Sequence, residues 1–195
     1  PLIFKNSPIL NWHFEDALHE YATCDKQNYI KGTITGDYYI ESRRLGARSQ
    51  DQNKYHRDAM VFEELLKDNP NNDRHNFYGA QSYFDHRDYD NAIRLYRKRI
   101  ELCGWFEEVY HSYYRIAQAF EHKGLPWPEI EKAYLDAHNY CKDRAEPLYE
   151  IARHYRKEDN FVMAYKFAKI GSKIPYPKNC SLFIFKDVYD YKILD

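Results

Sequence analysis

Residues 77–100 read FYGAQSYFDHRDYDNAIRLYRKRI, a pattern that recurs twice farther along the chain. The related stretches are YYRIAQAFEHKGLPWPEIEKAYLDA at residues 113–137 and LYEIARHYRKEDNFVMAYKFAKI at residues 148–170. An alanine holds the equivalent position in each stretch, with separations of 37 and 35 residues along the series Ala80, Ala117 and Ala152. A period in the mid-thirties is typical of repeats that contain two helices each.

The residue types in each repeat fit two closely packed helices. A small residue in the first helix lets the second helix approach, and an aromatic residue three positions later fills the space beside it. These aromatic residues are Tyr83, Phe120 and Tyr155. The second helices have their own pairs, which are Ala92 with Tyr96, Ile130 with Tyr134, and Ala164 with Ala168. The pattern predicts stacked helical hairpins.

This pattern resembles the tetratricopeptide repeat family over residues 74–174. Residues 55–72 read as half of an earlier repeat, and residues 180–195 read as the start of a further helix. The family's usual tryptophan, alanine and proline are replaced at three positions, by Asn76, Arg99 and Gly104. The resemblance implies a mainly α fold, a tetratricopeptide-like α-α superhelix over residues 51–195, with a small N-terminal β-hairpin segment.

The resemblance also implies a concave face lined by residues of the first helices. Two positions in each repeat would line a groove for a protein partner, and they are Phe77, Gln81, Tyr114, Gln118, Tyr149 and Arg153. The alternative is that one or two of these aromatic side chains belong to the core. Arg156 and Lys157 either add a basic end to the groove or form an ordinary solvated pair.

The composition excludes some classes of partner. With 29 basic and 30 acidic side chains in 195 residues, the net charge of −1 creates no field that would recruit nucleic acid. No apolar run approaches the roughly 18 residues needed to span a bilayer. The four cysteines lie far apart, which favours free thiols in the reducing cytoplasm over a disulfide framework. Nothing near Pro1 resembles a signal peptide, and we expect a processed or excised fragment.

Residues 1–50 have neither the period nor the composition of the repeats. Residues 28–42, NYIKGTITGDYYIES, alternate on both sides of TITG and predict a β-hairpin. We expect a short helix near Trp12 beside it. A lone hairpin with a short helix cannot bury enough surface to be stable by itself. This segment must therefore pack on the repeats or on another part of a larger protein.

An ordered set of short motifs runs through the chain. It contains W.....LHEY.TC from Trp12, GARS.D..KY.RDA from Gly46 and GW.EE.Y from Gly104. The set is similar to that of family 2 glycosyltransferases, in which a GT-A nucleotide-sugar domain precedes tetratricopeptide-like helices. The resemblance implies that residues 1–50 are the tail of the catalytic domain and that the donor-binding half lies upstream.

The parent enzyme implied by this resemblance would transfer a sugar from a nucleotide-sugar to a glycan or polypeptide acceptor. It would use Mn²⁺ or Mg²⁺ to neutralise the diphosphate leaving group. The present chain alone would be inactive and would need no cofactor. The repeats would hold the acceptor or mediate self-association.

The resemblance implies roles for residues near the N-terminus. His19 would help to bind the cation, and Glu20 would act as general base toward the acceptor. Trp12 would form a wall of the acceptor pocket. A guanidinium group can bind two phosphate oxygens at once. The candidates for a diphosphate clamp are Arg43, Arg44 and Arg48. Each role has an alternative. Trp12 could pack under a helix, His19 and Glu20 could belong to an ordinary amphipathic turn, and the arginines could lie in a solvated basic loop.

Asp88, Tyr89 and Asp90 spell the DxD pattern of metal-dependent glycosyltransferases, but they lie between the two helices of a repeat. We therefore expect Asp88 to cap the second helix. The other function that the sequence supports is a stand-alone scaffold, which grips a peptide or protein partner through its tetratricopeptide-like groove and has no catalytic role.

Overall fold

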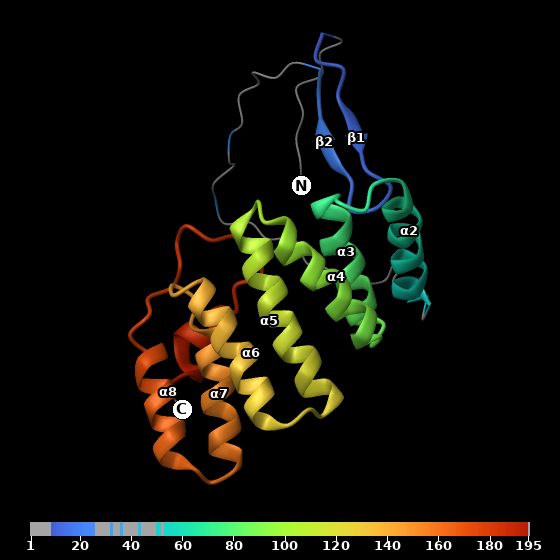
Figure 1. Ribbon diagram of the computed structural model, residues 1–195. Coiled ribbons are helices and arrows are strands. Elements are labelled where there is room, and N and C mark those ends of the chain that lie inside the picture. Colours follow the sequence, from blue (N-terminus) through green and yellow to red (C-terminus); the bar gives the residue numbers. More distant parts are fainter. Residues whose placement is uncertain are drawn as a thin grey trace. The chain divides into compact units, whose positions relative to one another are not determined.

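The computed structural model describes residues 9–25, 32, 36, 43, 50–51 and 53–194. The chain forms two compact units, Pro1–Lys54 and Tyr55–Asp195. The second unit contains the helical repeats (Figure 1).

The described part of the first unit is a small antiparallel hairpin. Strand β1 (His13–Glu15) pairs with β2 (Tyr21–Thr23), and the Tyr21 hydroxyl donates a 2.7 Å hydrogen bond to Glu15 Oε2. The strands therefore occupy the stretch where we expected a short helix. The hairpin expected at residues 28–42 lies outside the described residues, apart from two glycines.

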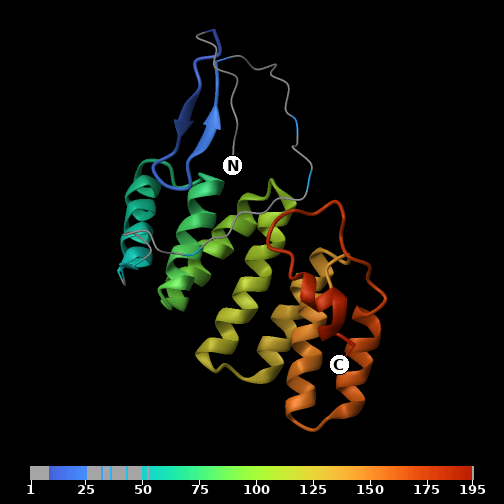
Figure 2. The same cartoon turned by 180° about the vertical axis from the view of Figure 1, so that it is seen from behind.

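The second unit consists of seven α-helices and one short π-helix among the described residues. They are α2 (Lys54–Asp68), α3 (Asp73–Asp85), α4 (Tyr89–Leu102), α5 (Phe106–Lys123), α6 (Trp127–Tyr140), α7 (Glu146–Lys157), α8 (Phe161–Gly171) and η1 (Val188–Lys192). Helices α3 to α8 form three successive hairpins, and α2 precedes them as the half repeat (Figures 1 and 2). The mainly α superhelix with a small hairpin is confirmed.

Polar side chains mark the starts of three helices. Asn72, Asp88 and Asn160 accept hydrogen bonds from backbone N–H groups three residues later. The predicted capping role of Asp88 is confirmed, because its Oδ1 accepts from Asn91 N at 3.2 Å. Helix α5 ends at Gly124, whose φ of +70° is the left-handed conformation that glycine adopts most readily.

The repeat alanines lie in the core as predicted. Ala80 and Ala117 are fully buried, Ala152 is nearly so, and Tyr96 and Tyr134 fill the spaces that these small residues leave. The aromatic residues of the first helices are less uniform, because Phe120 and Tyr155 are only partly buried.

Two departures from the family pattern are accommodated by polar contacts. Asn76 is buried, and its amide donates to the carbonyl oxygens of Pro70 and Asn72 at 3.1 and 2.8 Å. Arg99 is fully buried and donates from Nε to Glu108 Oε2 at 2.9 Å. Burial raises the pKa of Glu108, while the Arg99 guanidinium opposes that shift.

Beyond α8 the chain turns back along the repeats. Residues 181–185 contain no helix, and regular structure resumes only before η1, so the further helix expected at residues 180–195 is limited to its second half. In Figure 2 this segment, in red, returns from the end of α8 toward α5.

Candidate functional site

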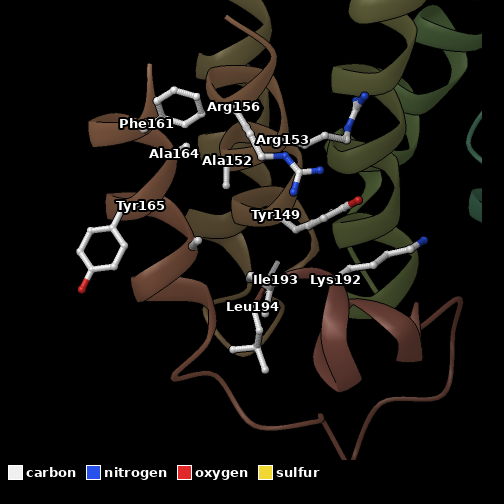
Figure 3. Close-up of a pocket in the computed structure, with 11 residues that line it drawn as sticks. Tyr149, Ala152, Arg153, Arg156, Phe161, Ala164, Tyr165, Lys192, Ile193 and Leu194 are labelled. Carbon is white, nitrogen blue, oxygen red and sulfur yellow. The ribbon is translucent and has the colours of Figure 1, made fainter. Parts of the chain in front are cut away.

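The last hairpin and the C-terminal residues enclose a cavity of about 220 Å³. Helix α7 contributes Tyr149, Arg153 and Arg156, and α8 contributes Phe161 and Tyr165. The other lining residues are Ala152, Ala164, Ala168, Lys192, Ile193 and Leu194. Figure 3 shows the Arg156 guanidinium directed toward the Tyr149 ring. The cavity is therefore aromatic on one side and cationic on the other.

The three cations of this cavity differ in how they are held. Arg153 donates to Glu121 Oε1 at 2.7 Å and to Glu150 Oε2 at 2.6 Å, and these carboxylates raise its pKa. Lys192 pairs with Asp187 at 2.5 Å. Arg156 forms no ion pair within the described part of the chain, and it is exposed. Its charge is available to an incoming anionic group.

Helix α8 exposes four large apolar side chains, with Lys166 and Lys169 exposed among them. Phe161, Val162, Tyr165 and Ile170 are between 53% and 69% exposed. Large apolar side chains exposed on one helix, here with the Lys169 ammonium over the Tyr165 ring at 5.2 Å, mark a candidate interaction surface. We name these four residues the α8 face.

A second feature is a row of buried charges on α5 and at the start of α7. Glu107, Arg144 and Glu146 are at most 4% exposed. Arg144 donates from Nη2 to Glu146 Oε1 at 2.9 Å, and its guanidinium lies over the Tyr110 ring at 4.4 Å. Together with His111 of α5, these three charged residues form what we call the charged strip.

Residues 181–185 lie on the charged strip. Glu107 Oε2 accepts from Ser181 N at 2.7 Å and from Leu182 N at 2.6 Å. Arg144 donates to Leu182 O at 3.3 Å and to Phe183 O at 2.9 Å. The strip therefore binds the backbone of a non-helical segment that bends at Leu182 and Phe183.

Two further contacts extend this arrangement. Phe185 N donates to Glu146 Oε1 at 3.3 Å, and the Tyr189 hydroxyl donates to Glu146 Oε2 at 2.7 Å. Burial and the Glu146 carboxylate raise the pKa of Tyr189, which keeps its hydroxyl protonated as a donor.

The predicted groove residues divide between the core and the surface. Phe77 and Tyr114 are buried, as the alternative interpretation of their positions had it, and the Tyr114 hydroxyl donates to Glu150 Oε1 at 3.0 Å. Gln118 is partly exposed and accepts from Arg115 Nη1 at 3.1 Å. Gln81 is also partly exposed, whereas Tyr149 and Arg153 line the cavity.

The residues predicted for transferase chemistry lie in the other unit. His19 and Glu20 are exposed just before β2, Trp12 is partly buried next to β1, and Arg43 is exposed. Arg44 and Arg48 lie outside the described residues. No group of three or more possible metal ligands surrounds His19 or any other described residue, so no cation site is assigned.

Sequence reasoning did not identify the charged strip. Glu107 belongs to the GW.EE.Y motif but was given no role, and Arg144 and Glu146 precede the repeat positions that carry the period. No local signal joins them, because Glu107 lies at the start of α5 while Arg144 and Glu146 lie at the start of α7.

No family model and no curated protein matches the sequence. Solved structures do resemble the chain. The structure described as "MamA RS-1 ArsTM double mutant" has a TM-score of 0.53 at 14% identity, over 63% of this chain and 66% of that chain. "Crystal structure of MamA" has a TM-score of 0.52 at 16% identity, over 70% of this chain and 76% of that chain. "MamA MSR-1 C2" has a TM-score of 0.51 at 18% identity, over 62% and 67%.

At such low identity these likenesses establish the fold alone. Among the described residues, none of the helices combines the length and the apolar character that crossing a membrane requires. Helical geometry and structural likeness agree: this chain has a tetratricopeptide-like helical-repeat fold.

Proposed function

We propose that the chain is a protein-interaction scaffold that binds a polypeptide partner at the α8 face and the adjoining cavity. The observation that carries this proposal is the group of exposed apolar residues on α8, next to a cavity lined by Arg156, which has no ion pair among the described residues. Aromatic residues and arginine are the residue types that dominate binding energy in protein interfaces.

The lining of the cavity indicates the chemistry of the partner. An apolar or aromatic side chain would be buried against Phe161 and Tyr165, and a carboxylate would pair with Arg156. A charge-assisted pair of this kind fixes orientation, while the apolar contact supplies most of the affinity. The preferred ligand is therefore an acidic segment with an aromatic or aliphatic anchor.

Selection of displayed random peptides on the full chain tests this function. Enriched peptides should combine an acidic residue with an apolar anchor, and the double variant Phe161→Ala, Tyr165→Ala should lower their affinity at least tenfold, which is about 1.4 kcal/mol. Lys132→Ala, at an exposed position of α6, is the control and should bind like the unaltered chain. Equal binding by the double variant would remove the α8 face from the proposal.

The transferase origin is a second candidate, and it is supported only by the ordered motifs that begin at Trp12, Gly46 and Gly104. Neither the comparisons nor the described structure adds support for it. Calorimetry with nucleotide-sugars and Mn²⁺ tests it: we expect heat from a chain extended upstream and none from these 195 residues. Loss of activity in the extended protein with His19→Ala would assign that side chain a role.

A further inference from the structure

We propose that the charged strip is a second polypeptide-binding site, and that residues 181–185 occupy it as a tethered ligand. The site would take a partner segment that bends as residues 182–183 do, with two aromatic side chains one residue apart, like Phe183 and Phe185 here. This inference goes beyond the function proposed above, because the strip shares no residue with the α8 face.

Most of the hydrogen bonds between the strip and residues 181–185 are made by backbone groups of the segment. Two N–H groups bind Glu107, two carbonyl oxygens bind Arg144, and the N–H of Phe185 binds Glu146. Main-chain groups are present in every polypeptide, so another segment that bends at the place of Phe183, whose φ is +47°, can make the same bonds. Such a pattern is the way in which peptide-binding proteins obtain affinity before side-chain pockets add specificity.

The charges of the strip need an occupant. Glu107 is buried, and the hydrogen bonds to its carboxylate within the described structure come from Ser181 and Leu182. A buried carboxylate without donors is strongly unfavourable, and a repeat interior built only for stability is better served by apolar residues. The strip therefore has the composition of a binding site that must always be filled.

The aromatic side chains of the occupant are only partly covered. Phe183 and Phe185 remain 43% and 38% exposed, and their rings lie 4.6 Å from His111 and 6.0 Å from Tyr114. Core aromatic residues such as Phe77 are fully buried. Leu182 also packs against the hydrophobic core. Removing both rings should therefore weaken the tethered segment, and another segment with larger side-chain contacts can compete with it.

His111 adds a polar group that the present occupant does not use. Its Nε2 accepts from Arg115 Nε at 3.2 Å, so the proton of the neutral ring is on Nδ1. That Nδ1 is buried and has no acceptor among the described residues. A partner segment with an oxygen within reach of this Nδ1 would satisfy it and would bind better than residues 181–185.

The short link between α8 and residues 181–185 keeps the strip occupied. Residues 172–180 join α8 to the bound segment and contain Pro175 and Pro177. A ligand tethered by so short a linker has an effective concentration on the order of millimolar, so a free segment of equal affinity binds only weakly. Weakening the tethered segment should therefore expose the site.

The test uses the full chain and a fluorescent synthetic peptide of residues 178–192, with fluorescence anisotropy as the measurement. In a chain with Phe183→Ala and Phe185→Ala, the peptide should bind at least tenfold more tightly than to the unaltered chain. Adding Glu107→Ala should abolish this gain. Glu129→Ala is the matched control, because Glu129 also lies in the first turn of its helix but is exposed.

Equal, weak binding to all these chains would overturn the proposal. If the altered chain unfolds, a protease site placed after Tyr176 in the full chain gives a second test. After cleavage, the released segment should exchange with isotopically labelled peptide while the helical circular dichroism persists. Loss of helix on release would show the segment to be structural and would overturn the proposal.

Two further outcomes are informative. A dimer that the free peptide dissociates, seen by analytical ultracentrifugation, would place a second copy's segment on the strip and support the site. Phe161→Ala with Tyr165→Ala should leave this peptide's affinity unchanged, so failure of the function proposed at the α8 face is distinguished from failure here.

Discussion

A single buried arginine replaces an alanine of the repeat pattern, and its partner gives it a measurable role. Arg99→Ala would leave Glu108 buried without its guanidinium, and we expect a loss of about 3–5 kcal/mol in the free energy of unfolding. The double variant Arg99→Met, Glu108→Leu removes both charges and should be close to the unaltered chain. Urea unfolding of the three proteins decides the matter. A single variant as stable as the double would show that the ion pair contributes nothing.

A buried histidine makes the stability depend on pH. Burial, with the cations Arg115 and Arg144, holds the pKa of His111 well below its ordinary 6.5. The folded chain keeps this ring neutral, whereas the unfolded chain takes up a proton below pH 6.5. The stability from this group is therefore present above pH 6.5 and falls as pH decreases, by up to about 1.4 kcal/mol per pH unit.

Urea unfolding between pH 7.5 and 5.5 measures this effect. His111→Phe keeps a ring beside Phe77 and Phe183 but cannot titrate, so its stability should fall less with acid. Parallel pH profiles for the two proteins would contradict the assignment, whatever the absolute stabilities.

The residues that the sequence predicted well are those that repeat. Ala80, Ala117 and Ala152 were located because their spacing is regular, and the same steric rule placed Tyr96 and Tyr134. The charged strip was missed because its bonds join Ser181 to a glutamate 74 positions earlier, and no local pattern reports such a pairing. The repeat register alone did not show that Phe77 and Tyr114 are buried, because a side chain can point toward the groove and still be covered by other residues.

Among the elements, the helices were predictable and the hairpin was not. Helices of 11 to 18 residues carry several turns of periodic signal. Strands β1 and β2 have three residues each, too few to show alternation. The connection between the strands contains Asp16 and His19, both with positive φ. The polar composition of the stretch does not predict this backbone conformation.

The end of α8 packs against the C-terminal residues through a glycine. A Cβ atom at Gly171 would lie 2.2 Å from Ile193 Cδ1, so Gly171→Ala forces the isoleucine side chain to move. We expect a loss of about 1–3 kcal/mol, despite the usual gain of alanine over glycine in a helix.

A double-mutant cycle identifies the cause. Ile193→Val removes the Cδ1 atom, and in that background Gly171→Ala should cost little or even stabilise. Thermal or urea unfolding of the four proteins gives the coupling energy. A cost that is the same in both backgrounds would mean that the clash with Ile193 is not the source.

At the scale of the whole repeat unit, the C-terminal segment connects the two candidate sites. Residues 181–185 lie on the charged strip, and about ten residues later Lys192, Ile193 and Leu194 line the cavity beside α8. In a simple helical array each repeat contacts only its neighbours. Here a segment from beyond the last repeat reaches back to α5, so a change at one site is transmitted to the other by displacement of a single chain.

This connection predicts negative coupling between the sites. A partner segment that displaces residues 181–185 would also withdraw Lys192, Ile193 and Leu194 from the cavity, which removes part of its wall and one cation. A peptide selected for the α8 face should therefore bind more weakly when the strip holds a free ligand, by about 5- to 150-fold, the range of typical coupling free energies. Thermodynamic linkage requires the reverse effect to be equal. Titrating each peptide in the presence and absence of the other measures the change in affinity at both sites. Independent binding would mean that Lys192, Ile193 and Leu194 keep their place when residues 181–185 leave the strip.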